Sequence, residues 1–190
     1  MLSVHDLEIR VGARVLMSDV TFRVGAGDKV GLVGRNGAGK TTLTKVLSGD
    51  LLPAAGRVDR SGELGYLPQD PRSGNPEDLA RTRILDARGL GQLAIGMHEA
   101  SLAMGDDDAD VAARAMRRYG SLTERFEALG GYAAEAEAAS IAHNLALPDR
   151  ILDQPLSTLS GGQRRRIELA RILFSDAQTM ILDEPTNHLD

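Results

Sequence analysis

Apolar and polar residues alternate along two stretches near the N-terminus. Residues 2–10 carry apolar side chains at every second or third position, and residues 20–24 alternate again. A period near two is typical of a strand that buries one face. The pattern predicts two half-buried antiparallel strands, with a turn at residues 25–28.

A short apolar run at residues 29–34 leads into a glycine-rich loop. Apolar residues then recur at helical spacing over residues 40–48, and Gly49 ends this periodicity. The order predicts a strand, a loop and a helix. Two further short strands are predicted at residues 56–59 and 63–67.

The composition changes between residues 77 and 147, where Ala, Leu, Arg and Glu dominate and β-branched residues are few. Such a stretch favours helices over strands. The helical pattern is interrupted at Gly89, at Gly105 to Asp108 and at Gly130–Gly131. The sequence therefore predicts a helical insert made of several helices.

After the insert the chain returns to a mixed pattern. Residues 163–174 have the spacing of an amphipathic helix, and residues 179–182 are a continuous apolar run. A short run of this kind is typical of a buried parallel strand. Aromatic residues make up 3% of the chain, so we expect an aliphatic core.

Length, charge and cysteine content narrow the classes of protein. A chain of 190 residues suffices for one domain with an insert. Its net charge of −5 provides no global basic field for nucleic acid, and its lack of cysteine excludes disulfides and thiol chemistry. Because no apolar run reaches the roughly 20 residues of a membrane span, we expect a cytoplasmic protein.

A phosphate-binding pattern, G-x-x-x-x-G-K-[ST], lies between the predicted strand and helix. Glycines let backbone amides turn toward phosphate, and the helix adds its positive end. Lys40 can reach the β- and γ-phosphates, and Thr41 can ligate Mg²⁺. A glycine-rich turn that merely begins a helix is the alternative. The candidate ATP-binding residues of this loop are Gly34, Arg35, Asn36, Gly37, Ala38, Gly39, Lys40, Thr41 and Thr42.

Two carboxylates follow the apolar run at residues 180–182. At the end of a buried strand, Asp183 can bind Mg²⁺ through water and Glu184 can polarise an attacking water. A helix N-cap with a solvated neighbour would explain the same two residues.

A second glycine-rich segment precedes the predicted helix at residues 163–174. Its small residues would expose amides and a hydroxyl at a helix N-terminus, which suits a phosphate contact. A serine-capped helix after a turn is the alternative. The segment comprises Ser160, Gly161, Gly162 and Gln163.

Three consecutive acids, Asp106 to Asp108, stand between two predicted helices. A metal site is one interpretation of such a cluster. The favoured interpretation is a solvated hairpin tip, with an aspartate as the N-cap of the next helix.

In their order, these motifs make the chain resemble the ABC ATPases. The resemblance implies an α/β P-loop ABC nucleotide-binding domain with an antiparallel β subdomain and an inserted helical subdomain. Residues 34–42 resemble the Walker A loop, and residues 180–184 the Walker B motif. By this resemblance Gln69 is the Q-loop glutamine and joins Thr41 and Asp183 as a Mg²⁺ ligand. Lys40 and Glu184 are then the catalytic residues.

The resemblance also implies a partner. In ABC ATPases, two domains enclose two ATP molecules head to tail, and the signature of one contacts the γ-phosphate held by the other. Ser160 to Gln163 are the signature here, and Leu189–Asp190 resemble the D-loop. We expect a second ABC domain, in the same full-length chain or in a homodimer, and weak or no hydrolysis without it.

Residues 183–190, with Thr186-Asn187-His188 at their centre, resemble the ABC-F branch. This implies a protein acting on the ribosome, in translation regulation or antibiotic resistance. The alternative is the ATPase subunit of an ABC membrane transporter. Residues 90–130 resemble the short helical-hairpin arm of ABC-F proteins. Arg114, Arg117 and Arg118 share one face there, which could meet RNA or be a solvated face paired with acids.

Two departures from the ABC pattern affect the expectation. Val11 stands where ABC domains usually stack an aromatic residue on adenine, which weakens the expected selectivity for adenine. The sequence ends just after the D-loop, so we expect an incomplete ABC domain. Residues 1–76 and 155–190 would form its ATP-binding core and residues 77–154 its helical subdomain.

Overall fold

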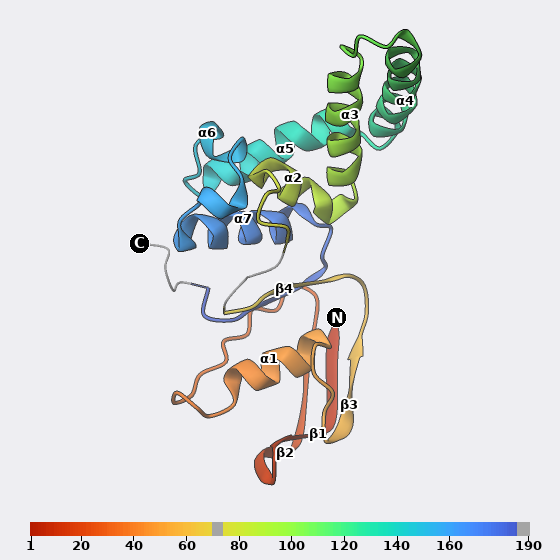
Figure 1. Ribbon diagram of the computed structural model, residues 1–190. Coiled ribbons are helices and arrows are strands. Elements are labelled where there is room, and N and C mark those ends of the chain that lie inside the picture. The colour runs from red at the N-terminus through yellow and green to blue at the C-terminus, as the bar shows by residue number, and fades with distance from the viewer. Residues whose placement is uncertain (70–73, 186–190) are drawn as a thin grey trace. The chain divides into compact units, whose positions relative to one another are not determined.

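The computed structural model describes residues 1–69 and 74–185, which form two compact units (Figure 1). The first contains residues 1–69 and 176–185, and the second contains residues 74–175. The predicted division between residues 154 and 155 differs from this one. Helix α7 (Gly161–Phe174) belongs to the helical unit, because its buried face packs within the helical core.

An antiparallel sheet forms one side of the first unit. Its strands are β1 (Leu2–Val11), β2 (Arg14–Val24) and β3 (Ala55–Arg60), in the order β2-β1-β3. The alternation in the first predicted strand matches the buried side chains of β1, which confirms the half-buried face. The second predicted strand is also confirmed, but β2 begins six residues earlier than expected.

Helix α1 (Lys40–Ser48) forms as predicted, and Gly49 ends it in the left-handed conformation. That conformation favours glycine and lets the Gly49 amide bond to the last carbonyls of the helix. The apolar face of the helix shares a core cluster with β1. The aliphatic core around α1 consists of Leu2, Val4, Leu7, Ile9, Leu43, Val46, Leu47 and Ile181.

A parallel strand pair completes the regular structure described in this unit. Strand β4 (Leu64–Leu67) pairs with β5 (Thr179–Leu182), so residues more than a hundred positions apart lie side by side. Ile181 of β5 reaches the core around α1. The carboxyl end of β5 thereby lies over the same helix that begins at the phosphate loop.

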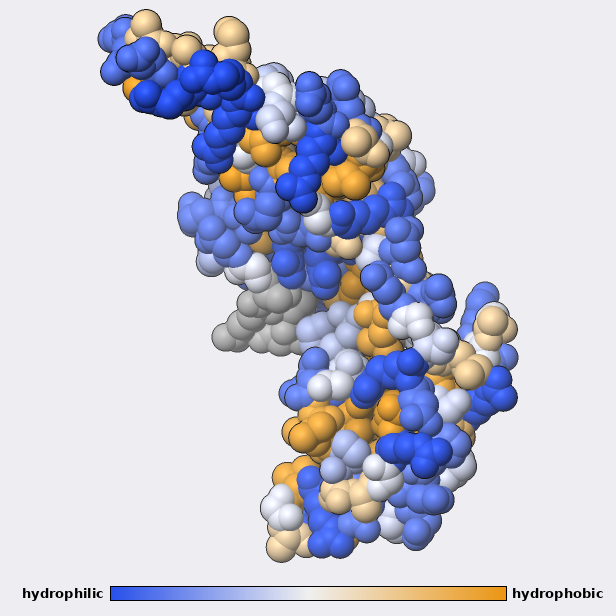
Figure 2. Space-filling view, turned by 90° about the vertical axis from the view of Figure 1, so that its right-hand side faces the viewer, coloured by the Kyte–Doolittle hydropathy of each residue, from blue (hydrophilic) through white to orange (hydrophobic). Residues whose placement is uncertain are grey.

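The prediction of a strand at residues 29–34 is wrong. These residues have no regular secondary structure, and Val30 and Val33 are 69% and 94% exposed. An extended segment becomes a strand only when a neighbouring chain supplies the ladder of hydrogen bonds. No strand of the described residues pairs with this one, and hydrophobic side chains show on the surface of the unit in the lower half of Figure 2.

The second unit is helical, as predicted. Its core comes mainly from α2, α5 and α7, where Ile84, Ile167 and Phe174 are fully buried. The 3₁₀ turns η1 and η2 and the short helix α6 complete the unit. Its elements are α2 (Ala80–Leu85), η1 (Asp86–Arg88), α3 (Gly91–Ala103), α4 (Ala109–Ala128), α5 (Gly131–Asn144), α6 (Asp149–Leu152), η2 (Leu156–Thr158) and α7.

Helices α3 and α4 form the predicted hairpin (Figure 1). The carboxylate of Asp108 accepts hydrogen bonds from the amides of Asp110 and Val111 and caps α4. The expected N-cap is therefore confirmed. Arg118 pairs with Glu99 across the hairpin at 3.1 Å, while Arg114 and Arg117 are exposed.

Candidate functional site

The phosphate loop leads directly into α1 and is closed by Lys40. The Lys40 ammonium donates hydrogen bonds to the carbonyl oxygens of Gly34 and Arg35, at 2.8 and 3.2 Å. Gly37 and Gly39 adopt φ values of 78° and 97°, a conformation that favours glycine. The loop therefore curls around the ammonium and presents the unbonded amides of the first helical turn.

Gly39 is also the point where the β1–β2 hairpin meets the loop. A Cβ atom on Gly39 would lie 3.1 Å from Cδ1 of Leu16, closer than an ordinary van der Waals contact. Leu16 belongs to the beginning of β2. The third glycine of the motif thus allows a close approach between the loop and the antiparallel sheet.

Asp183 is held against α1 at the end of β5. It is 4% exposed, and its amide donates to the carbonyl of Leu67, which extends the pairing of β4 and β5. The hydroxyl of Thr44 lies 3.3 Å from the Asp183 carboxylate and 2.9 Å from the carbonyl of Thr41, and can donate to one at a time. Thr44 therefore connects the Asp183 carboxylate to the first turn of α1.

The pKa of Tyr66 depends on the charges behind the phosphate loop. Its hydroxyl lies 3.5 Å from that of Thr44. Burial raises the pKa of Tyr66, the negative charges of Asp183 and Asp50 raise it further, and the hydrogen bond with Thr44 lowers it. The phenol is therefore neutral over the physiological range beside the buried carboxylate.

Glu184 follows Asp183 in the left-handed region, with φ of 47°. Residues other than glycine seldom adopt this conformation. It turns the chain sharply after the buried strand. Glu184 is half-buried and lines the same cavity as the phosphate loop.

The cavity beside the phosphate loop has a volume of 510 Å³. It brings together Glu184, Gln69 and Val11 with six of the nine predicted loop residues, and Gly34, Arg35 and Ala38 are not among its lining residues. Arg14 and Leu16 also line it, and sequence analysis missed both. Arg14 is the partner of Val11 in the β1–β2 register, and a predicted hairpin across residues 11–14 could have found it. Leu16 left no such signal. The lining residues are Val11, Arg14, Leu16, Asn36, Gly37, Gly39, Lys40, Thr41, Thr42, Gln69 and Glu184.

The donor set beside the cavity fits Mg²⁺. Thr41 and Gln69 line the cavity. Asp183 is connected to Thr41 by the hydroxyl of Thr44, which lies within hydrogen-bonding distance of both residues. Within residues 1–69 and 74–185, no group of three or more His, Cys, Asp or Glu side chains could hold a metal by itself. Mg²⁺ is usually held by one or two protein groups together with substrate phosphates and water. Such a sparse set of oxygen ligands meets that requirement.

The signature segment begins α7 in the helical unit. The Ser160 hydroxyl accepts a hydrogen bond from the amide of Gln163, and the Gln163 side chain accepts one from the amide of Ser160. This capping box satisfies two amides at the helix start. Around Gly161, a Cβ atom would meet no other atom within 4 Å. The predicted serine cap is present, and the backbone at Gly161 is open.

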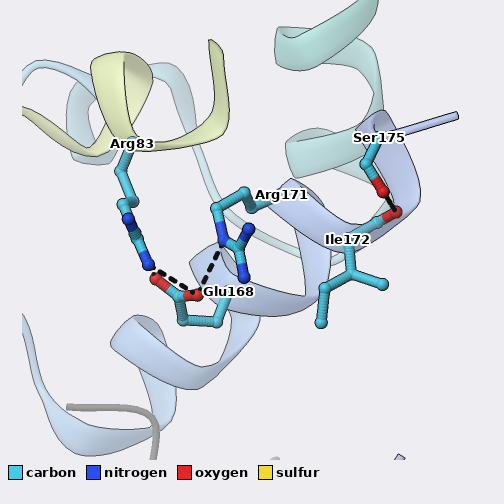
Figure 3. Close-up of polar contacts among 5 residues, drawn as sticks. All are labelled: Arg83, Glu168, Arg171, Ile172 and Ser175. Atoms are coloured by element: carbon cyan, nitrogen blue, oxygen red, sulfur yellow. Dashed lines mark hydrogen bonds and ion pairs between the residues drawn. The ribbon is translucent and has the colours of Figure 1, made fainter. Parts of the chain in front are cut away.

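A buried charge network holds α7 against α2 (Figure 3). Glu168 of α7 accepts hydrogen bonds from Arg83 of α2 and from Arg171, one turn further along α7. The Glu168 side chain is 5% exposed. The hydroxyl of Ser175 bonds to the carbonyl of Ile172 where the helix ends. The helix that carries the signature is therefore anchored by charge as well as by apolar packing.

A family model described as "ABC transporter" matches residues 17–187. The chain belongs to this family. The expected ABC fold and ABC membership are confirmed, and family membership supports ATP binding as the function of the phosphate loop. The ABC motif residues 186–190 lie outside the described residues. No helix within the described part of the chain is long and apolar enough to cross a membrane.

Curated relatives match the ABC chain along its whole length or nearly so. It is 40% identical to the tylosin resistance ATP-binding protein TlrC of Streptomyces fradiae, over 100% of this chain and 35% of TlrC. It is 35% identical to the energy-dependent translational throttle protein EttA of Escherichia coli, over 93% of this chain and 32% of EttA. The chain therefore spans about a third of the length of these relatives.

Solved structures of ABC proteins share the fold. The ATP-binding subunit of an ABC transporter matches with a TM-score of 0.71 and 22% identity, over 100% of this chain and 68% of that one. The ATP-binding cassette MJ0796 bound to ADP and Pi matches with a TM-score of 0.65 and 18% identity, over 100% of this chain and 76% of that one. At these identities the likeness concerns the fold alone.

Proposed function

We propose that this chain binds and hydrolyses ATP with Mg²⁺ as part of an ABC-F protein that acts on the ribosome. The observation that carries the hydrolytic part is the cavity in which Lys40, Thr41, Gln69 and Glu184 meet. Phosphate-binding amides, a cation, oxygen ligands for Mg²⁺ and a carboxylate base are the groups that water attack on a phosphate requires.

Each group in the cavity has a separate task. The amides of residues 37–42 and the Lys40 ammonium bind the phosphates and stabilise the charge that develops on them. Thr41 and Gln69 would hold Mg²⁺ directly, and Asp183 would hold it through water. Mg²⁺ would supply positive charge that offsets the negative charge on the phosphates. Glu184 orients the attacking water and accepts its proton.

The signature contributes to a different ATP, bound by a second ABC domain. The open backbone at Gly161 and the amides at the beginning of α7 suit a γ-phosphate. Ser160 to Gln163 therefore complete the site of the partner domain. The partner's signature completes the site beside Lys40.

The names of two relatives support a role in translation. One is named for tylosin resistance, and the other is called a translational throttle. The hairpin of α3 and α4 is the part of this chain that meets ribosomal RNA. Arg114 and Arg117 are exposed there and available for phosphate, whereas Arg118 is paired with Glu99.

Nucleotide binding and turnover test the first half of the proposal. Lys40→Ala should weaken ATP binding by at least tenfold, because the cation at the centre of the loop is lost. Glu184→Gln should retain ATP binding and reduce phosphate release by at least a hundredfold. Equilibrium binding of a fluorescent ATP analogue and a phosphate-release assay measure the two effects. Undiminished turnover by Glu184→Gln would contradict the assignment of the base.

Sedimentation with purified ribosomes tests the second half. The Glu184→Gln protein should sediment with ribosomes when ATP is present, and less without it. The double variant Arg114→Glu/Arg117→Glu should weaken this association, while Arg150→Glu, an exposed change elsewhere in the helical unit, should not. If the protein co-purifies with a transmembrane partner and shows no ATP-dependent binding to ribosomes, the transporter ATPase would be favoured instead.

A further inference from the structure

The end of the β1–β2 hairpin forms one wall of the cavity. Val11 and Arg14 are partners in the register, and both line the cavity. Gly12, between them, has φ of 59° and forms the tight turn. Leu16 holds the same hairpin against Gly39 of the phosphate loop. The wall is therefore fixed in place relative to the groups that bind phosphate.

This wall has no aromatic platform. Of the eleven described residues that line the cavity, none is Phe, Tyr, Trp or His. A purine ring placed there can contact the small apolar side chain of Val11, which is 57% exposed. Two cationic side chains are among the described lining residues, the ammonium of Lys40 and the guanidinium of Arg14.

Arg14 is available for a ligand. Its side chain is exposed, and no carboxylate among the described residues forms an ion pair with it. Arg10, its neighbour on the hairpin, is paired with Glu8 instead. A guanidinium is planar and stacks on aromatic rings, which an ammonium group cannot do. An unpaired guanidinium beside a phosphate loop is suited to the face of a nucleobase.

We propose that Arg14 stacks on the purine base of the bound nucleotide and takes the place of an aromatic residue. The inference rests on the proposed nucleotide site. A guanidinium stacked on a ring face interacts with the π electrons of the ring and not with the polar groups at its edge. The site therefore binds ATP and GTP with affinities within a few-fold of each other, and the phosphates provide most of the affinity.

Binding of three ligands by titration calorimetry tests this role. The ligands are ATP, GTP and inorganic tripolyphosphate, each with Mg²⁺. Arg14→Ala should weaken ATP and GTP by about three- to thirty-fold, the range of a cation–π contact, and leave tripolyphosphate unchanged. Arg14→Lys should recover only part of the purine affinity that Arg14→Ala loses, because an ammonium keeps the attraction to the ring face and loses the planar stacking. Arg23→Ala, an exposed arginine of the same strand, is the matched control.

Each other outcome has a distinct meaning. Equal weakening of all three ligands by Arg14→Ala, with recovery in Arg14→Lys, would make Arg14 a phosphate contact and overturn the proposal. An unchanged ATP affinity in Arg14→Ala would overturn it as well.

Lys40→Ala should weaken the binding of all three ligands. If it weakens none, the proposed phosphate site itself fails, independently of Arg14. Introducing Val11→Tyr into Arg14→Ala should restore purine affinity and leave tripolyphosphate unchanged.

Discussion

Arg83 and Glu168 form a doubly hydrogen-bonded ion pair that joins α2 to the helix carrying the signature. The Arg83 Nε lies 2.6 Å from Glu168 Oε1, and a second guanidinium nitrogen lies 3.2 Å from Oε2 (Figure 3). The side chains are 14% and 5% exposed. Because water is largely excluded, each charge depends on the other for compensation.

Glu168→Leu should destabilise the protein by about 3 to 5 kcal/mol, since it leaves Arg83 and Arg171 without their shared carboxylate in a buried position. Urea unfolding followed by circular dichroism measures the change. Asp153→Leu is the matched control, because it removes the carboxylate of the more exposed Arg81–Asp153 pair. Such a pair contributes at most about 1 kcal/mol. Equal losses in the two variants would show that burial does not govern the strength of these pairs.

Asp86 makes stability depend on pH. Burial raises the pKa of Asp86, and the positive charge of Arg83 lowers it by less. The folded state therefore holds this proton more tightly than the unfolded state, so its contribution to stability falls as pH rises above 3.8 through the raised pKa. At pH 7, Asp86→Asn should be more stable than the parent protein.

The advantage of Asp86→Asn should shrink as the pH is lowered through the raised pKa and below 3.8, where the parent carboxyl becomes protonated in both states. Urea unfolding of both proteins across this range measures the difference. A gain that is independent of pH would exclude the carboxyl charge as its cause.

Gly56 is required where β3 approaches β1. It has φ of 80°, and a Cβ atom there would overlap the carbonyl oxygens of His5 and Asp6. Gly56→Ala should destabilise the protein by roughly 2 kcal/mol or more, because it adds an overlap to a backbone conformation that itself costs 1–2 kcal/mol. Gly12→Ala, at φ of 59° in open space, should cost about 1 kcal/mol. Thermal unfolding compares the two, and equal losses would rule out the overlap.

Ser160, a residue of the predicted signature, caps α7. Ser160→Ala should reduce stability by about 1 kcal/mol, and Ser160→Asp should retain most of it, because a carboxylate can accept the Gln163 amide. Ser157→Ala, an exposed change in η2, should have little effect. Denaturant unfolding measures all three. If Ser160→Ala is neutral, the hydroxyl does not stabilise α7.

Local patterns were enough to predict most elements. The alternation from residue 2 to residue 10 became β1, and the spacing over residues 40–48 became α1 with Gly49 at its end. The phosphate-loop motif placed Lys40 at the start of a helix, where the structure has it. These features depend on the geometry of consecutive residues, which the sequence displays directly.

Contacts between distant residues could not be predicted in this way. The apolar run at residues 29–34 has the composition of a strand, yet pairing requires a second chain segment at its edge. The hydroxyl of Thr44 reaches Asp183 across 139 positions of sequence. Neither relationship leaves a periodic signal.

The sequence by itself therefore determined which residues have the chemistry for phosphate, Mg²⁺ and water, because motif spacing encodes local backbone geometry. The tertiary structure decided which of them share one cavity. It added Arg14 and Leu16 to that cavity, since the β1–β2 hairpin packs against Gly39. It also placed α7 in the helical unit, because packing and buried charge depend on segments that folding brings together.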